Sequence, residues 1–377
     1  MPIGSDTDGA APASGGFRYA TARSVAVVRL DHIGDHILGS GLFEALRRQL
    51  PQARITAIVR AQAAALYDAC PWIDRCIALR EPAPALGPAA SGRPVDWQRA
   101  LEGLQGSFDL VINPRFARDY YRASDVVRHL AAPHAIGFAQ GDPESDTAYT
   151  CLVDALPGLH VSGYAQALLH AAGADPGPCP PVVWIGPHEP RRVRQTLARA
   201  GWNGATPLVV LAPGASQAWR QWPQHRVMAL IDALTCQRRV RVVLAGSRLE
   251  LLRYPALRAW NHPQVIDLRG QLSLPQLAAC CHLAALFIGT DSGPKHVAAA
   301  AGTPVVEINH LPVDLDASQH AAWPTGPRWA ASGVPTVQVR PLGGFAPEHL
   351  LDGTSIAAVT VEQVLAEARR FLALDRS

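Results

Sequence analysis

The chain has 377 residues, 48% of them hydrophobic, which is enough to bury two sizeable cores. Its formal net charge is only +3 and its basic residues are scattered, a distribution that argues against a protein that binds nucleic acid. No run of about 18 uninterrupted apolar residues occurs, so a membrane-spanning helix is excluded.

Residues 1–20 are rich in Gly, Ala, Ser and Asp and lack the basic start and apolar run of a signal peptide, so we expect a disordered tail. The seven cysteines are odd in number, widely spaced and without a CxxC pair. They indicate buried thiols in a reducing compartment, which predicts a cytoplasmic protein. The sequence leaves open whether the protein contacts the inner face of a membrane peripherally.

Short β-branched runs alternate with helical patterns from Val25 onward, which is typical of parallel βαβ units. The strands predicted in the first half cover Val25–Leu30, Ile55–Val59, Asp109–Asn113 and Ala135–Phe138. The predicted helices cover His36–Leu50, Asp119–Ala131 and Val161–Ala172. The Pro-, Ala- and Gly-rich stretch Glu81–Pro94 predicts a surface loop.

The prolines and glycines between Asp175 and Pro190 predict a domain boundary. The second half repeats the alternation more regularly, with predicted strands at Leu208–Ala212, Val240–Ala245, Val265–Leu268, Ala285–Gly289 and Val305–Ile308. Helices are expected from Pro223 and Leu249, over Leu274–His282 and Pro294–Ala301, and near the end over Val361–Leu374, whereas Leu311–Gly353 carries no clear pattern.

These elements predict an α/β fold of two Rossmann-like, doubly wound domains. The N-terminal domain is expected over residues 21–180 and the C-terminal domain over residues 181–355. Residues 356–377 are expected to form a C-terminal helical segment.

The sharpest local signal is the segment Ile288–His296, in which a buried strand ends, the chain turns on two glycines and a helix begins. Ser292 suits the N-cap of this helix and Pro294 its first position. The free N–H groups of a helix start, with the side chains of Lys295 and His296, suit a phosphate or diphosphate. The alternative is an ordinary helix cap. Lys295 is the only lysine of the chain, which a coding bias toward arginine also explains.

A second loop, Ala212–Pro223, also lies after a strand and before a helix of the same predicted sheet. Ligands of open α/β sheets bind at such carboxyl ends of strands. Ser216 can donate its hydroxyl, and Arg220 offers a planar set of donors for phosphate oxygens. A solvated surface arginine is the alternative for Arg220.

A third loop, Arg29–Asp35, follows the first strand of the other domain and leads into an amphipathic helix. Asp35 falls at the start of this helix, where a carboxylate can cap the free N–H groups. The functional alternative is a general base that faces the space between the domains. Neither half contains GxGxxG or GxxxxGK[ST], so an NAD-dependent or P-loop enzyme loses its main support.

Together the three loops resemble glycosyltransferase family 9, which contains the heptosyltransferases of lipopolysaccharide core assembly. The opening pattern of that family, Arg-Leu-x-x-x-Gly-Asp, is matched by Arg29, Leu30, Gly34 and Asp35. Its middle pattern, Pro-Gly-Ala-Ser and then a basic residue and Trp-Pro, is matched by Pro213–Ser216, Arg220, Trp222 and Pro223. Its third pattern, Asp-Ser-Gly-Pro-x-His and then Gly-Thr-Pro, is matched by Asp291–Pro294, His296 and Gly302–Pro304.

The resemblance implies a GT-B fold, in which the active site lies in the cleft between two facing domains and the C-terminal helix packs back toward the N-terminal domain. It implies an inverting, metal-independent transfer of heptose from ADP-heptose to a hydroxyl of a lipopolysaccharide-core or related glycan or glycolipid acceptor. No cofactor is expected besides the donor substrate. The N-terminal domain would face the acceptor, and the C-terminal domain would bind the nucleotide sugar.

By this resemblance Asp35 would deprotonate the acceptor hydroxyl as it attacks the anomeric carbon. Ser216, Arg220, Ser292 and Gly293 would bind the leaving diphosphate, so that preformed donors stabilise its developing charge.

The remaining predicted contacts concern the sugar, the ribose and the acceptor. Asp291 would hold sugar hydroxyls, His296 would lie close to the diphosphate or the sugar, and Glu250 would grip the ribose. Arg115 and Arg118, just after a predicted strand, could meet an anionic acceptor, and solvated loop residues are the alternative.

The sequence departs from the family pattern at two places. Arg220 stands where a lysine is common, which keeps the charge, and Asp31 and His32 stand where small or Ser-like residues are frequent, which leaves the acceptor open. Two alternative functions remain. One is a transferase or epimerase that uses another nucleotide sugar, and the other is a non-catalytic nucleotide-sugar-binding protein. Asp35 argues against the last, because a protein without turnover need not keep a base there.

Overall fold

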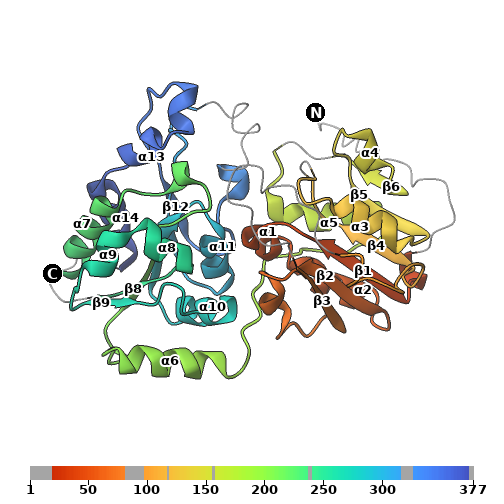
Figure 1. The fold of residues 1–377 in the computed structure, drawn as a ribbon, viewed down its shortest axis with the longest axis horizontal. Helices are drawn as coiled ribbons and strands as arrows, with labels where there is room; N and C mark the ends of the chain where they lie inside the picture. Colours follow the sequence, from red (N-terminus) through yellow and green to blue (C-terminus); the bar gives the residue numbers. More distant parts are fainter. Residues whose placement is uncertain are drawn as a thin grey trace, which may run out of the picture.

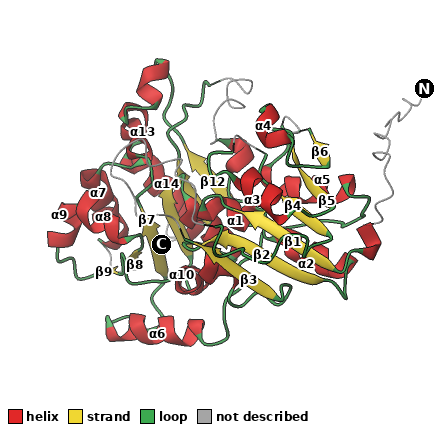
Figure 2. Ribbon diagram, turned by 45° about the vertical axis from the view of Figure 1, so that its right-hand side comes forward, coloured by secondary structure: helices red, strands yellow, loops and turns green. Residues whose placement is uncertain are grey.

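The computed structural model describes residues 19–80, 97–116, 119–154, 158–236, 240–315 and 326–372. Two six-stranded parallel sheets lie side by side in it, each covered by helices on both faces (Figures 1 and 2). The predicted tail, except for its last two residues, and the predicted loop Glu81–Pro94 lie outside the described residues.

Both sheets have the strand order of a doubly wound fold. The first has the order β3-β2-β1-β4-β5-β6 and the second β12-β11-β10-β7-β8-β9, which is 3-2-1-4-5-6 within each domain. The first sheet consists of β1 (Ser24–Arg29), β2 (Arg54–Arg60), β3 (Arg75–Leu79), β4 (Leu110–Asn113), β5 (His134–Phe138) and β6 (Cys151–Val153). The second consists of β7 (Leu208–Ala212), β8 (Arg241–Leu244), β9 (Val265–Asp267), β10 (Leu286–Thr290), β11 (Val305–Ile308) and β12 (Thr336–Val339). The predicted α/β fold is thereby confirmed.

The sequence pattern missed β3, β6 and β12, all of which are edge strands. An edge strand is partly exposed and mixes polar with apolar residues, so it lacks the continuous apolar run of a central strand. In β3, for example, only Ile77 and Leu79 are buried, whereas every residue of β4 is buried.

The helices of the first domain are α1 (Ile33–Leu38), α2 (Gly41–Gln49), α3 (Ala123–Leu130), α4 (Pro143–Asp146) and α5 (Tyr164–Ala171). Those of the second half are α6 (Glu189–Arg199), α7 (Gln224–Thr235), α8 (Arg248–Arg253), α9 (Pro255–Ala259), α10 (Leu274–His282), α11 (Gly293–Ala300), α13 (Thr354–Ala358) and α14 (Val361–Leu372). Short 3-10 turns include η2 (Ala64–Tyr67), η4 (Val161–Gly163) and η5 (Ala218–Arg220).

The single helix predicted over His36–Leu50 is two helices, α1 and α2, with a break at Gly39 and Ser40. The Ser40 hydroxyl donates to the carbonyl of Ile37 at 2.7 Å and accepts from the N–H of Val182 at 2.6 Å. The segment that links the domains, residues 172–188 between α5 and α6, is called the linking segment. The break between α1 and α2 thus anchors the linking segment to the first domain through a polar contact.

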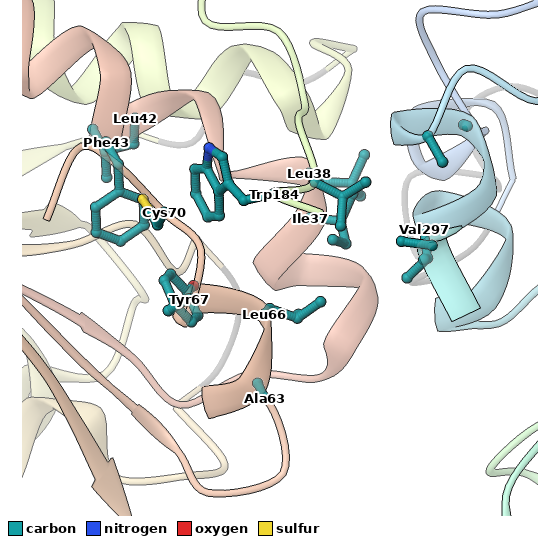
Figure 3. Packing of buried hydrophobic residues seen from close by; sticks show 14 of the residues in the cluster. Ile37, Leu38, Leu42, Phe43, Ala63, Leu66, Tyr67, Cys70, Trp184 and Val297 are labelled. Carbon is teal, nitrogen blue, oxygen red and sulfur yellow. The ribbon is translucent and has the colours of Figure 1, made fainter. Parts of the chain in front are cut away.

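The two sheets share one apolar core. Along β1, Val25 and Val27 belong to this shared core, whereas Ala26 and Val28 face a separate outer core of the first domain. The shared core continues into the second domain, and Figure 3 shows Val297 of α11 facing Ile37 and Leu38 of α1. The domains are therefore packed against each other through apolar side chains.

The C-terminal helix does not pack toward the N-terminal domain, contrary to what the resemblance implied. Helix α14 lies beside α7 and contacts the second sheet, on the side remote from the first domain (Figure 1). Its apolar side chains Val364 and Ala368 are buried in the outer core of the second domain. The physical reason is that this outer face of the second sheet needs an apolar cover, which α14 provides.

The domain boundary predicted between residues 180 and 181 stays a prediction. The structure shows which parts of the two domains the linking segment contacts. The ring of Trp184 lies 6.1 Å from that of Phe43 and 5.8 Å from that of Tyr67, both in the first domain. The next element, α6, packs on α10 of the second domain.

Cys76 and Cys236 are exposed, so the expectation of buried thiols was wrong for these two cysteines.

We expect Gly41→Ala to destabilise the protein, because a Cβ there would lie 2.5 Å from the backbone of both Cys179 and Pro180. Forcing these backbones apart should cost about 2 kcal/mol of unfolding free energy. Gly186→Ala, in the linking segment that Gly41 contacts, is the control, since its Cβ would lie at an ordinary distance of 3.8 Å from the Glu189 side chain. Urea unfolding of both variants checks this, and equal stabilities would contradict it.

Candidate functional site

The three loops predicted to carry chemistry follow β1, β7 and β10. The strand order reverses between β1 and β4 in the first sheet and between β7 and β10 in the second. Such switch points are where open α/β sheets bind ligands. The topology therefore places all three loops at ligand-binding positions.

The loop after β1 and the loop after β10 are in direct contact, and α1 lies beside α11 (Figure 1). A Cβ on Gly34 would lie 2.9 Å from Cδ2 of His296, and a Cβ on Gly293 would lie 3.1 Å from Cβ of Ile33. Only glycine allows this approach of the two backbones. Residues of both domains therefore line one site.

Asp35 lies in the first turn of α1 and is half-buried. Its Oδ2 accepts a hydrogen bond from the backbone N–H of His32 at 3.1 Å, which is a capping contact. Burial, followed by the negative charge of Asp31, raises the pKa of Asp35 to about 6. A carboxyl group with a pKa close to neutrality is suited to general base catalysis, and the capping contact does not prevent that role.

The neighbouring carboxylate of Asp31 is held by two arginines. Arg115 donates from Nη1 to Oδ1 at 2.5 Å, and Nε of Arg29 lies 3.5 Å from Oδ2. Burial alone would raise the pKa of Asp31, but Arg115 and Arg29 lower it. Asp31 is therefore ionised, and its charge disfavours ionisation of Asp35. Arg115, predicted to contact an acceptor, is thus engaged with Asp31, and Arg118 lies outside the described residues.

Sequence reasoning missed Arg60 and Tyr121, which also lie beside this loop. The guanidinium carbon of Arg60 is 4.6 Å from the ring centroid of Tyr121, whose hydroxyl lies 2.8 Å from Nε2 of His32. The pKa of His32 is lowered to about 4, mainly by burial and then by the charge of Arg60. Arg220 of the second domain contributes more weakly. Arg60 is the last residue of β2, so its place at the carboxyl edge of the sheet was a signal in the sequence.

Arg220 is not a freely solvated arginine. Its Nη1 lies 3.7 Å from Oδ2 of Asp291, and its guanidinium carbon lies 4.5 Å from the ring centroid of Trp219. The Trp219 ring in turn packs edge-on against His310 at 4.7 Å. Ser216 is exposed on the same loop. The loop after β7 thus presents a positioned cation and a hydroxyl.

The start of α11 is available to a ligand. Ser292 is the N-cap residue, but its hydroxyl donates to the carbonyl of Thr290 at 3.3 Å and makes no cap bond to the helix. Gly293 is the first helical residue. A helix start without a side-chain cap retains N–H donors and a partial positive charge.

Lys295 does not lie on the ligand side, contrary to the prediction that it contacts the donor. Its side chain is 0% exposed, and Nζ lies 2.5 Å from Oδ1 of Asp291 and 2.9 Å from Oε1 of Glu307. The reason is its position one turn after Asp291, which directs the ammonium into the domain toward β11. Glu307, which sequence reasoning missed, is a buried carboxylate within an otherwise apolar strand.

His296 lies at the contact between the domains and is buried. Burial, followed by the charge of Lys295, lowers its pKa well below the usual value. The imidazole is therefore neutral at neutral pH and can offer one donor and one acceptor.

Glu250 lies in α8, with its carboxyl group against the backbones of Gly214 and Gly246. These glycines belong to the loops after β7 and β8, so the carboxyl group is placed between the two loops. Burial raises the pKa of Glu250 to about 7.

Among the residues predicted to bind the donor, four buried polar atoms lack a hydrogen-bond partner in the part of the chain that the structure describes: Arg220 Nε, Glu250 Oε2, Asp291 Oδ2 and His296 Nδ1. Buried polar atoms without partners are rare in native proteins. Together these atoms suit a ligand that supplies both donors and acceptors.

None of the helices in the described ranges is long and apolar enough to cross a membrane. The described residues also contain no group of three or more His, Cys, Asp or Glu side chains arranged to hold a metal ion. Metal independence nevertheless stays a prediction.

Comparison with known proteins gives related sequences. The chain is 25% identical over 296 residues to lipopolysaccharide heptosyltransferase 3 of Escherichia coli, an alignment that covers 77% of this chain and 82% of that protein. A protein of the same name from Escherichia coli strain K12 is 35% identical over 118 residues, 30% of this chain and 32% of that protein.

Solved structures share the fold. A glycosyl transferase family 9 protein from Veillonella parvula has a TM-score of 0.76 at 18% identity, covering 95% of this chain and 99% of that one. The E. coli ADP-heptose LPS heptosyltransferase II has a TM-score of 0.67 at 19% identity, covering 94% and 100%. These neighbours confirm the predicted GT-B fold. The model of "Glycosyltransferase family 9 (heptosyltransferase)" matches residues 97–309, more than half of the chain, so this protein belongs to glycosyltransferase family 9.

Proposed function

We propose that the protein transfers heptose from ADP-heptose to a hydroxyl of a lipopolysaccharide-core or related glycan acceptor, with inversion at the anomeric carbon and without a metal ion. The observation that carries this proposal is the group of four buried polar atoms near the loops of the second sheet that have no hydrogen-bond partner among the described residues. A nucleotide sugar has the phosphate, ribose and sugar oxygens that such atoms require.

On the donor side, the diphosphate would lie at the start of α11, where Ser292 and Gly293 offer backbone N–H groups. Arg220 and Ser216 would add side-chain donors from the loop after β7. The carboxylate of Asp291 would accept hydrogen bonds from sugar hydroxyls. A solved neighbour, the E. coli heptosyltransferase WaaC with ADP (TM-score 0.63, 16% identity), is described as an ADP complex, which supports ADP as the nucleotide.

The ribose would lie beside Glu250, whose buried carboxyl group reaches the loops after β7 and β8. Two ribose hydroxyls could donate to its two oxygens, which would supply the hydrogen-bond partner that Oε2 lacks within the described ranges. His296 would meet the diphosphate or the sugar at the contact between the domains.

On the acceptor side, Asp35 would take the proton of the acceptor hydroxyl. The acceptor oxygen then forms its bond to the anomeric carbon as the bond from that carbon to the diphosphate oxygen breaks. The negative charge that develops on the departing ADP is stabilised by Arg220 and the start of α11. One displacement of this kind inverts the anomeric configuration.

The acceptor would lie beside the first domain, where Arg60 and Arg115 supply positive charge suited to an anionic glycan. Arg118 stays a predicted acceptor contact. We further propose that the protein acts in the cytoplasm, at the inner face of the inner membrane if its acceptor is a glycolipid. A non-catalytic binding protein would share the donor side but has no need of a base at Asp35.

Replacement of the base tests the reaction. Asp35→Asn should lower kcat by at least about 100-fold, because a general base contributes roughly 10²- to 10⁴-fold. The Kd for ADP should change less than about threefold, since Asp35 does not belong to the second domain. Glu44→Gln in α2 is the matched control, a half-buried carboxylate on the next helix that pairs with Arg48, with turnover expected within about twofold. Turnover by Asp35→Asn at the control rate would rule out this base.

The pH dependence follows from the pKa of Asp35, raised to about 6. The base must be ionised, so kcat at saturating donor should fall about tenfold per pH unit below about pH 6 and level off above it. His32 and His296 have lowered pKa values, so their protonation should not change kcat in this pH range. A kcat that is constant from about pH 5 to 8 would contradict the assignment.

Thermal unfolding with ADP, UDP, GDP and their sugars tests the donor. A ligand at 100 times its Kd stabilises the folded state by about 2.7 kcal/mol, so ADP and ADP-heptose should raise Tm selectively. Glu250→Gln should reduce the ADP shift, and Glu44→Gln should not. A Tm shift selective for UDP or GDP would mean that the donor carries that nucleotide in place of ADP. The absence of a Tm shift with every ligand would refute nucleotide-sugar binding.

A further inference from the structure

Asp291 and Lys295 are part of a buried charged network beneath the donor side of the site. Besides its contacts with Lys295, Glu307 accepts from Nδ2 of Asn309 at 2.6 Å and from Nε2 of Gln338 at 3.1 Å. Both Glu307 oxygens are therefore satisfied from inside the domain. The network anchors Lys295 to strands β11 and β12 of the second sheet.

The Asp291 carboxylate has one bound oxygen and one open oxygen. Oδ1 lies 2.5 Å from Nζ of Lys295, whereas Oδ2 has no hydrogen-bond partner among the described residues. Oδ2 is 3.7 Å from Arg220, a residue of the loop assigned to the donor diphosphate. The side chain of Asp291 is only 6% exposed, so its orientation is set by its partners and not by solvent.

Lysine suits this position for a chemical reason. An ammonium group is compact and directs its three donors in separate directions, which matches two carboxylates on different elements. A guanidinium group is planar and larger, and the site of Nζ is fully enclosed. This explains why the only lysine of a chain with 34 basic residues stands here.

The charges of the network are balanced. Lys295 and Arg220 face Asp291 and Glu307, so two cations meet two anions. Burial alone would lower the pKa of Lys295, but Asp291 and Glu307 raise it, so the ammonium remains charged. Removing one member leaves another buried charge uncompensated, which is strongly destabilising.

We propose that Lys295, anchored by Glu307, is a positioning residue that holds Oδ1 of Asp291 and thereby aims Oδ2 at a hydroxyl of the donor sugar. This inference rests on the proposed function, since it concerns the sugar of ADP-heptose. It assigns Lys295 a role in recognising the sugar and none in binding ADP.

A double-mutant cycle tests the proposal. Lys295→Met together with Glu307→Gln removes one charge of each sign and keeps the side-chain volumes similar. This pair of substitutions should lower kcat/KM for ADP-heptose at least tenfold and change the Kd for ADP less than threefold. In an Asp291→Asn background the same pair should change kcat/KM less than threefold, because Lys295 acts through Asp291.

Two results would overturn the proposal: equal losses in both backgrounds, or a parallel loss of ADP and ADP-heptose affinity, which a merely structural role would produce. The failure of the proposed function is distinguishable, because the unmodified protein would then bind no ADP-heptose. Circular dichroism and Tm show whether each variant is folded.

A second measurement leaves Lys295 in place. Labelling with [15N]lysine gives a single side-chain ammonium signal, since the chain has one lysine. ADP-heptose should shift this signal more than ADP does, and the difference should vanish in Asp291→Asn. Equal shifts with ADP and ADP-heptose in the unmodified protein would contradict the proposal.

Discussion

The contact between the start of α1 and the start of α11 is the constraint on which the site depends. Gly34 and Gly293 bring the backbones so close that any side chain at either position would displace His296 or Ile33. This approach joins the loop that carries Asp35 to the loop that carries Asp291. Burial is the main reason that the pKa of Asp35 is raised to about 6, and the charge of Asp31 is the next.

A similar electrostatic arrangement occurs in both domains. In the first, a carboxylate after β1, Asp31, is held by the buried Arg29 and the partly buried Arg115, and its charge acts on Asp35. In the second, a carboxylate after β10, Asp291, is held by Lys295. In each case neighbouring cations keep a buried carboxylate ionised at the carboxyl edge of a parallel sheet. The cations differ because Asp31 is reached from two sides by forked guanidinium groups, whereas Lys295 occupies an enclosed position between two carboxylates.

The accuracy of the predicted elements depended on where they lie in the sheets. Strand β7, strand β11 and helix α10 have the predicted bounds, because central strands and core helices carry long apolar patterns. The edge strand β12 was missed, because its residues are only partly buried. Helix α14 was found, but its packing partner was wrong, since an amphipathic pattern indicates that one face is buried and does not say against what.

The sequence by itself determined the doubly wound fold, the three loops at the switch points and the family, because these follow from local periodicity and from short motifs. Asp35, Ser216, Arg220, Asp291, Ser292, Gly293 and His296 could be named from those motifs. Only the tertiary structure decided that Lys295 faces inward and that Glu307 belongs to the surroundings of the site. The direction of a side chain and the charge of its neighbours depend on residues far apart in the chain, and no local pattern specifies which of them meet.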